Sequence, residues 1–166
     1  SSLKNSIKIH HFMSKNNQNL IVFQYLPWST LDQVFRGDRK VYKLKLLVDR
    51  LIQLVEQLYL VGIVHRDLTP SNILVNVDKE GNFIDLKLID FAYAMRSGDE
   101  YIDVNLGKIN TLNLGRGYKP GPHIWDDAFS VLHILNLIES WGGIEFSRQK
   151  SDLQSKVGRL EWVYKE

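Results

Sequence analysis

Three polar side chains, Asp67, Asn72 and Asp90, have the types and order that phosphoryl transfer requires. That reaction needs one carboxylate to orient or deprotonate the attacking hydroxyl, and an amide and a second carboxylate to hold the Mg²⁺ ions that bridge the phosphates. The residue order therefore predicts Asp67, Asn72 and Asp90 as catalytic residues. Asn72 and Asp90 would be the metal ligands, and ATP and Mg²⁺ the cofactors.

The elements around these residues are predicted to bring them together. Asn72 is followed by an apolar run, 73–75, then by a polar turn, 78–82, and by a second alternating strand, 86–89, that ends at Asp90. A hairpin of this kind places the loop before its first strand close to the end of its second. The alternative is a polar loop with an N-capping Asp and an unrelated Asp at the end of a strand. That alternative requires loop, hairpin and second Asp to coincide by chance.

A long amphipathic helix is predicted to lead into this loop. Apolar residues recur at steps of three and four, which is the spacing of one helical face, and Gly62 follows as a good C-terminal residue. The apolar positions are Leu44, Leu47, Val48, Leu51, Leu54, Val55 and Leu58.

The composition is typical of one globular domain. The 166 residues are 44% hydrophobic, with four Trp, seven Tyr and seven Phe. The net charge of +2 is too small to indicate nucleic acid as a partner. The absence of cysteine excludes disulfides and is compatible with a reducing cytoplasm. We therefore expect a cytoplasmic protein, with a peripheral position at the inner face of the membrane as the alternative.

The segment HRDLTPSN (65–72), with Asp90-Phe91-Ala92, resembles the catalytic loop and metal-binding motif of the protein-kinase-like family. The resemblance implies an α+β fold, with a kinase-like large lobe, a partial small lobe and an amphipathic C-terminal helix. Residues 1–28 would form the last small-lobe strands and the hinge, 29–143 the large lobe, and 144–166 the C-terminal helix. The small-lobe strands would lie in 7–25, a short helix in 29–35, and the start of the central large-lobe helix in 124–132.

The same resemblance implies a nucleotide site. Phe23 would lie behind the adenine, Gln24 and Leu26 would offer hinge backbone hydrogen bonds, and Leu74 with Ile89 would form the adenine floor. Ordinary strand packing would also explain the apolar members of this set.

Three further residues would support the catalytic loop. His65 and Arg66 would brace it, and Asp127 would hold its backbone, as an Asp does in the family. Alternatively, Asp127 is a helix N-terminal carboxylate stabilised by the helix dipole, and one residue can do both.

The chain also departs from the family pattern. Ala92 replaces the usual Gly, Thr69 replaces the Lys common in Ser/Thr kinases, and the Ala-Pro-Glu motif is absent around 115–122. The glycine-rich phosphate loop and the strand Lys paired with a helix Glu are not in these residues. We therefore expect an upstream segment to complete the small lobe.

The polar loop 94–122 resembles an activation segment. Ser97, Tyr101 and Thr111 could be phosphorylated, with Arg66 as the nearby cation. The alternative is a solvated surface loop.

The C-terminal residues repeat with a heptad pattern. Phe146, Leu153 and Leu160 are seven apart, and Lys150, Val157 and Tyr164 stand at the alternating position. The pattern predicts the beginning of a coiled coil that supports self-association. The alternative is an amphipathic helix that packs back onto the large lobe.

A kinase-like lobe that runs into a heptad tail is similar to the kinase half of bacterial O-antigen chain-terminating kinase/methyltransferases. That resemblance implies transfer of the γ-phosphoryl group to the terminal sugar of a polysaccharide, with a methyltransferase domain as partner. The alternatives are a Ser/Thr/Tyr protein kinase with a protein acceptor, or a pseudokinase scaffold that only binds partners.

Overall fold

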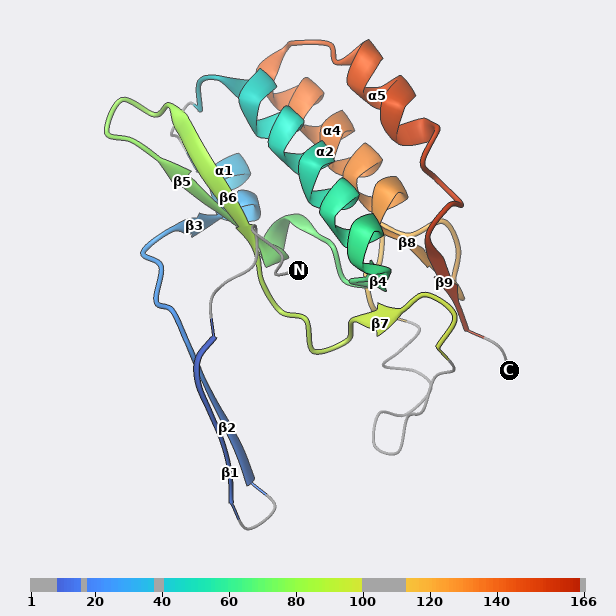
Figure 1. The fold of residues 1–166 in the computed structure, drawn as a ribbon. Helices are drawn as coiled ribbons and strands as arrows, with labels where there is room; N and C mark the ends of the chain where they lie inside the picture. Colours follow the sequence, from blue (N-terminus) through green and yellow to red (C-terminus); the bar gives the residue numbers. More distant parts are fainter. Residues whose placement is uncertain (1–8, 16–17, 38–40, 100–112, 165–166) are drawn as a thin grey trace.

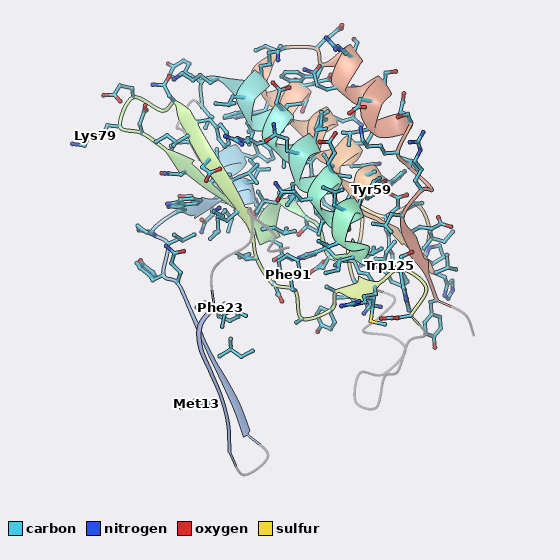
Figure 2. All side chains as sticks on the ribbon, viewed as in Figure 1. Met13, Phe23, Tyr59, Lys79, Phe91 and Trp125 are labelled. Carbon is cyan, nitrogen blue, oxygen red and sulfur yellow. The ribbon has the colours of Figure 1, made fainter. Side chains whose placement is uncertain are left out.

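The computed structural model describes residues 9–15, 18–37, 41–99 and 113–164. Its first element is the antiparallel hairpin of β1 (Ile9–Lys15) and β2 (Gln18–Phe23), which projects away from the helices in Figure 1. The hairpin predicted within 7–25 is therefore confirmed. Met13 and Phe23, labelled in Figure 2, are 47% and 55% exposed, so this hairpin adds little to the core.

A short strand and a short helix follow the hairpin. The strand β3 (Ser29–Thr30) pairs with β5 (Ile73–Val77), and α1 (Leu31–Arg36) begins directly after β3. Thr30 caps α1 through a reciprocal pair of hydrogen bonds with Gln33, at 3.2 and 2.9 Å. The helix predicted over 29–35 therefore starts two residues later, because 29–30 are paired in the sheet.

The predicted amphipathic helix is confirmed as α2 (Leu44–Val61). Gly62 ends it in the left-handed conformation, with φ of +66°, and donates its N–H to the last turn. Its apolar face lies between helices α4 (Asp127–Gly142) and α5 (Ser147–Gln154) and strand β6 (Phe83–Leu88), where it forms the centre of the main core. The buried residues of this face are Leu44, Leu47, Val48, Leu51, Ile52, Leu54, Val55 and Leu58.

The predicted hairpin after the catalytic motif is also confirmed. A 3₁₀ turn, η1 (Pro70–Asn72), leads into β5 (Ile73–Val77), which pairs antiparallel with β6 (Phe83–Leu88). Ile73 pairs with Leu88, so the residues just outside the hairpin, Asn72 and Ile89, face each other. Strand β4 (Ile63–Val64), which precedes this unit in the chain, pairs antiparallel with β7 (Met95–Arg96), which follows it.

The large helix of the C-terminal half is α4 (Asp127–Gly142), preceded by the strand β8 (Ile124–Asp126). The first three residues of the predicted helix start are thus extended. Asp126 caps the helix, since its Oδ1 accepts a 3.0 Å hydrogen bond from the N–H of Phe129. Figure 1 shows α4 beside α2 and α5. No helix among the described residues is long and apolar enough to cross a membrane.

The prediction of one continuous helix over 144–166 is wrong. Helix α5 (Ser147–Gln154) is short, and the chain then turns into β9 (Glu161–Val163), which pairs with β8. Gly158, with φ of +78°, lies in the turn between them. Phe146 and Leu153 are buried in the main core, while Leu160 packs on a second cluster around Trp125 and Trp162.

The heptad spacing therefore reflects packing within the chain. Its apolar positions face two different parts of the lobe, so they leave no continuous apolar stripe for a coiled-coil partner. The alternative, an amphipathic helix packed back onto the lobe, describes residues 147–154.

Candidate active site

Asp67 and Asn72 are joined directly. The side-chain amide of Asn72 donates to the carbonyl oxygen of Asp67 at 2.8 Å and to its Oδ2 at 2.9 Å. The 3₁₀ turn makes this possible, because the N–H of Asn72 bonds to the carbonyl of Thr69 at 3.0 Å and curls the loop back. The carboxylate of Asp67 is thereby fixed relative to Asn72.

Asp90 is delivered to the same place by the hairpin. The N–H of Ile89, its neighbour, donates a 2.9 Å hydrogen bond to the carbonyl of Asn72. Asp90 itself has a φ of +61°, a conformation that a non-glycine residue adopts at some cost. Its Oδ1 accepts a 3.3 Å hydrogen bond from the N–H of Ala92. Ala92 does not have a positive φ, so this site does not require the glycine usual at that position.

The donor set fits Mg²⁺. Carboxylate and amide oxygens are ligands that this ion prefers, and it commonly takes only one or two protein groups alongside substrate phosphates and water. The described part of the chain holds no group of three or more His, Cys, Asp or Glu side chains that could bind a metal ion by itself. Asn72 and Asp90 would hold the ion with ATP, and bound Mg²⁺ supplies neutralisation of phosphate charge.

His65 and Asp127 lie in the core beside the loop 65–72 and hold its backbone in place. Both are buried, and Oδ2 of Asp127 accepts a 2.7 Å hydrogen bond from the N–H of His65. Nε2 of His65 lies 3.0 Å from the carbonyl oxygen of Ile89, so this nitrogen carries the ring proton. The ring also packs edge-on against Phe91, at 4.8 Å between centroids. The loop before Asp67 and the strand before Asp90 are therefore held together.

Burial controls the protonation of this pair. It lowers the pKa of His65, although the charges of Asp67 and Asp90 act in the opposite direction. It raises the pKa of Asp127 to about 7, against the effect of the backbone N–H groups of His65 and Arg66. Both the neutral and the charged imidazole can donate from Nε2 to the carbonyl of Ile89, and burial is what favours the neutral form.

Arg66 is buried in the folded chain. Its side chain is 3% exposed, its φ is +68°, and its Nε donates a 2.5 Å hydrogen bond to the carbonyl of Tyr93. Of the residues suggested for phosphorylation, Ser97 donates its N–H to the carbonyl of Gly62 at 2.9 Å. Tyr101 and Thr111 lie outside the described residues.

The residues suggested for adenine come from two hairpins. Leu74 and Ile89 are half-buried on the side of the β5–β6 hairpin opposite its core-facing residues Ile73 and Leu88. Phe23 ends β2, and Gln24 and Leu26, both half-buried, follow it in the link to β3. Leu74 and Ile89 lie on the same side of this hairpin, where Lys87 pairs with Leu74, and the adenine roles of all five stay a prediction.

A residue that the sequence did not single out, Gly115, also contacts the carboxylate of Asp67. Its N–H donates a 2.9 Å hydrogen bond to Oδ1 of Asp67. A Cβ at this position would lie 2.7 Å from the carbonyl oxygen of Arg66, and its φ is +60°. Trp125 holds the preceding residue, since its Nε1 donates to the carbonyl of Leu114 at 3.0 Å. The feature of the sequence that could have indicated this role is the pair of glycines at 115 and 117, because glycine readily adopts positive φ and permits close backbone approach.

The site therefore consists of an oriented carboxylate (Asp67), an amide (Asn72) and a second carboxylate at the end of a hairpin (Asp90). This arrangement is typical of phosphotransferases. The family model described as "Protein kinase domain" matches residues 1–110. The chain therefore belongs to the protein kinase family.

Two curated relatives agree with this family. A serine/threonine-protein kinase of Drosophila melanogaster is 31% identical over 91 residues, and one of Drosophila yakuba is 40% identical over 91 residues. Each match covers 52% of this chain and 12% of the relative, so the chain matches only a small part of these longer proteins. Neither relative supports the polysaccharide acceptor that the sequence suggested.

Proposed function

We propose that this chain carries the catalytic loop of an ATP- and Mg²⁺-dependent kinase that transfers the γ-phosphoryl group to a serine or threonine hydroxyl of a protein. The observation that carries the proposal is the hydrogen-bonded pair of Asp67 and Asn72, next to Asp90 at the end of β6. The names of the Drosophila relatives support the protein acceptor. A segment outside these residues would supply the phosphate loop and the Lys-bearing strand.

In this proposal each residue of the site has a defined role. Asp67 accepts a hydrogen bond from the acceptor hydroxyl and takes its proton as the new phosphate ester forms. Asn72 fixes the orientation of Asp67 through its amide group and shares with Asp90 the binding of Mg²⁺. Leu74 and Ile89 offer an apolar face to the adenine.

A sugar hydroxyl is the second candidate acceptor. Thr69, rather than a Lys, stands two residues after Asp67. The family resemblance assigns that Lys to the transferred phosphate in Ser/Thr protein kinases, so the substitution favours a different acceptor. O-antigen-type polysaccharide would then be the substrate, and an associated methyltransferase the partner.

The test uses the intact protein with γ-labelled ATP, Mg²⁺ and two acceptor pools, a protein extract and O-antigen-type oligosaccharides. Label is expected in protein, and Asp67→Asn should lower its rate about a thousandfold while nucleotide binding persists. Asp90→Ala should lose Mg²⁺-dependent nucleotide binding itself. Asp85→Asn is the matched control, because it changes a carboxylate of the same strand to which the proposal gives no role. This carboxylate lies 3.8 Å from the ammonium group of Lys87.

The outcomes separate the candidates. Label in the oligosaccharides, lost in Asp67→Asn, would replace the protein acceptor by a sugar. Unchanged turnover in Asp67→Asn would contradict its assigned role. Absence of both nucleotide binding and transfer would make the protein a scaffold that uses the fold only to bind partners.

A further inference from the structure

The last described strand lies against the catalytic loop. In β9, the ring of Trp162 lies over the guanidinium of Arg66, with 4.5 Å between Cζ and the ring centroid. The ring of Trp125, from β8, is 5.7 Å from the same Cζ. Arg66 and Trp162 are each 3% exposed. An arginine stacked on aromatic faces away from water is held more firmly than one at the surface.

The segment that carries Trp162 is fastened to the lobe at several points. The phenolic hydroxyl of Tyr59 donates a 2.5 Å hydrogen bond to the carbonyl of Lys156. The N–H of Gly158 donates to Oδ2 of Asp126 at 2.6 Å, next to the residue that braces His65. Past Trp162, the N–H of Tyr164 bonds to the carbonyl of His123 at 2.8 Å. These contacts fix where the ring of Trp162 lies.

Two contact routes run from Trp162 to Asp67. The first passes through Arg66, which directly precedes Asp67. The φ of Arg66, +68°, must be maintained by its surroundings. The second passes through Trp125, which pairs with Trp162 across β8 and β9 and has its ring 5.5 Å away. Trp125 holds Leu114, and the next residue, Gly115, donates to Asp67.

We propose that Trp162 is a positioning residue for the catalytic aspartate, acting through Arg66 and Trp125. This inference rests on the proposed function, because the reaction that it serves is phosphoryl transfer at Asp67. An aromatic face from the chain's own C-terminal segment holds the guanidinium of Arg66. Loss of the ring would let the backbone at Arg66 and the loop at Leu114 move, and Asp67 would then point at the acceptor less often.

The test compares Trp162→Leu with Trp162→Phe in the intact protein. Trp162→Leu is expected to lower kcat about tenfold with little change in KM for ATP, since it removes an aromatic contact to a desolvated cation. Trp162→Phe should restore most of kcat, because it keeps a ring face and loses only the Nε1 hydrogen bond to the carbonyl of Asp99.

Two controls separate positioning from folding. Val163→Ala alters the neighbouring β9 residue, which is 39% exposed, and should leave kcat unchanged. Leu153→Ala empties a buried position of α5 and should lower Tm while kcat is kept at a temperature where the protein is folded. If kcat in Trp162→Leu stays within about twofold of wild type, or if Trp162→Phe falls as far, the proposal is overturned.

Hydrogen exchange decides the same point without an acceptor. In Trp162→Leu, the amides of residues 65–72 should exchange faster, while those of α2 keep their protection. If wild-type protein transfers no phosphoryl group, the proposed function fails, yet this measurement still tests the link between Trp162 and the loop. Unchanged exchange at residues 65–72 would overturn that link.

Discussion

The N–H of Gly115 donates a 2.9 Å hydrogen bond to Oδ1 of Asp67 from 48 residues further along the chain. Asn72 holds the other carboxylate oxygen at 2.9 Å. The carboxylate of Asp67 is thus oriented from both sides, once by a neighbour in its own loop and once by a segment that only the fold brings near. The predictions below follow from this arrangement and from the core beneath it.

Gly115→Ala should reduce activity. The added Cβ would lie 2.7 Å from the main-chain oxygen of Arg66, which cannot move away as a flexible side chain could. The loop would shift and weaken the hydrogen bond to Asp67, and such misplacement can cost about a hundredfold in kcat. Gly117→Ala is the matched control, because it also has positive φ, +84°, but its Cβ would meet nothing within 4 Å. Steady-state kinetics should show a much larger loss in the first variant, and equal losses would contradict the steric argument.

Asn72→Ala should weaken metal use and catalysis together. It removes two hydrogen bonds to Asp67 and the amide oxygen proposed for Mg²⁺. The Mg²⁺ concentration for half-maximal activity is expected to rise about 10- to 100-fold, as for other changes at metal sites. Asn82→Ala, which alters a turn asparagine bonded to Asp78, should leave this concentration unchanged. A normal Mg²⁺ titration in Asn72→Ala would exclude Asn72 as a ligand.

The carboxyl of Asp127 should make stability depend on pH. Burial raises its pKa in the folded protein to about 7, above the ordinary value of 3.8. The folded state therefore binds the proton more tightly than the unfolded state, and stability from this group is complete below about pH 4 and lost as pH rises to about 7. The slope is at most about 1.4 kcal/mol per pH unit for one group.

Asp127→Asn removes this titration but keeps an oxygen that can accept from the N–H of His65. Urea unfolding between pH 5 and 8 should show the variant gaining stability relative to wild type as pH rises toward 7. A constant difference across that range would show that Asp127 does not titrate there.

Leu153→Ala should destabilise the protein by about 2–5 kcal/mol, the usual cost of emptying a buried leucine site. Leu153 is 0% exposed and lies in the core shared by α2 and α4. Leu60→Ala is the control, because that side chain is 85% exposed on α2 and should change unfolding free energy little. If Leu153 instead contributed to a coiled coil, its substitution would change the oligomeric state in analytical ultracentrifugation and leave monomer stability nearly intact.

The features that depend on residues close together in the chain could be predicted from the sequence. The order of Asp67, Asn72 and Asp90, the hairpin between the last two, and the helix ending at Gly62 all depend on residues close in the chain. Short-range patterns such as turn residues, alternation and helical spacing report those elements because neighbouring residues decide them. The resemblance to kinases rested on the same segments, and the family match confirms it.

The tail shows where such patterns fail. Phe146, Leu153 and Leu160 keep heptad spacing, yet Leu160 lies past the left-handed turn at Gly158 and packs on a different cluster from the other two. Spacing reports that a residue is buried but not which surface buries it. Contacts between Trp162 and Arg66, or Gly115 and Asp67, join residues far apart in the chain. They follow from how the helices and strands pack. The sequence alone determined the order of Asp67, Asn72 and Asp90 and the hairpin between the last two, while tertiary packing determined what holds them in place.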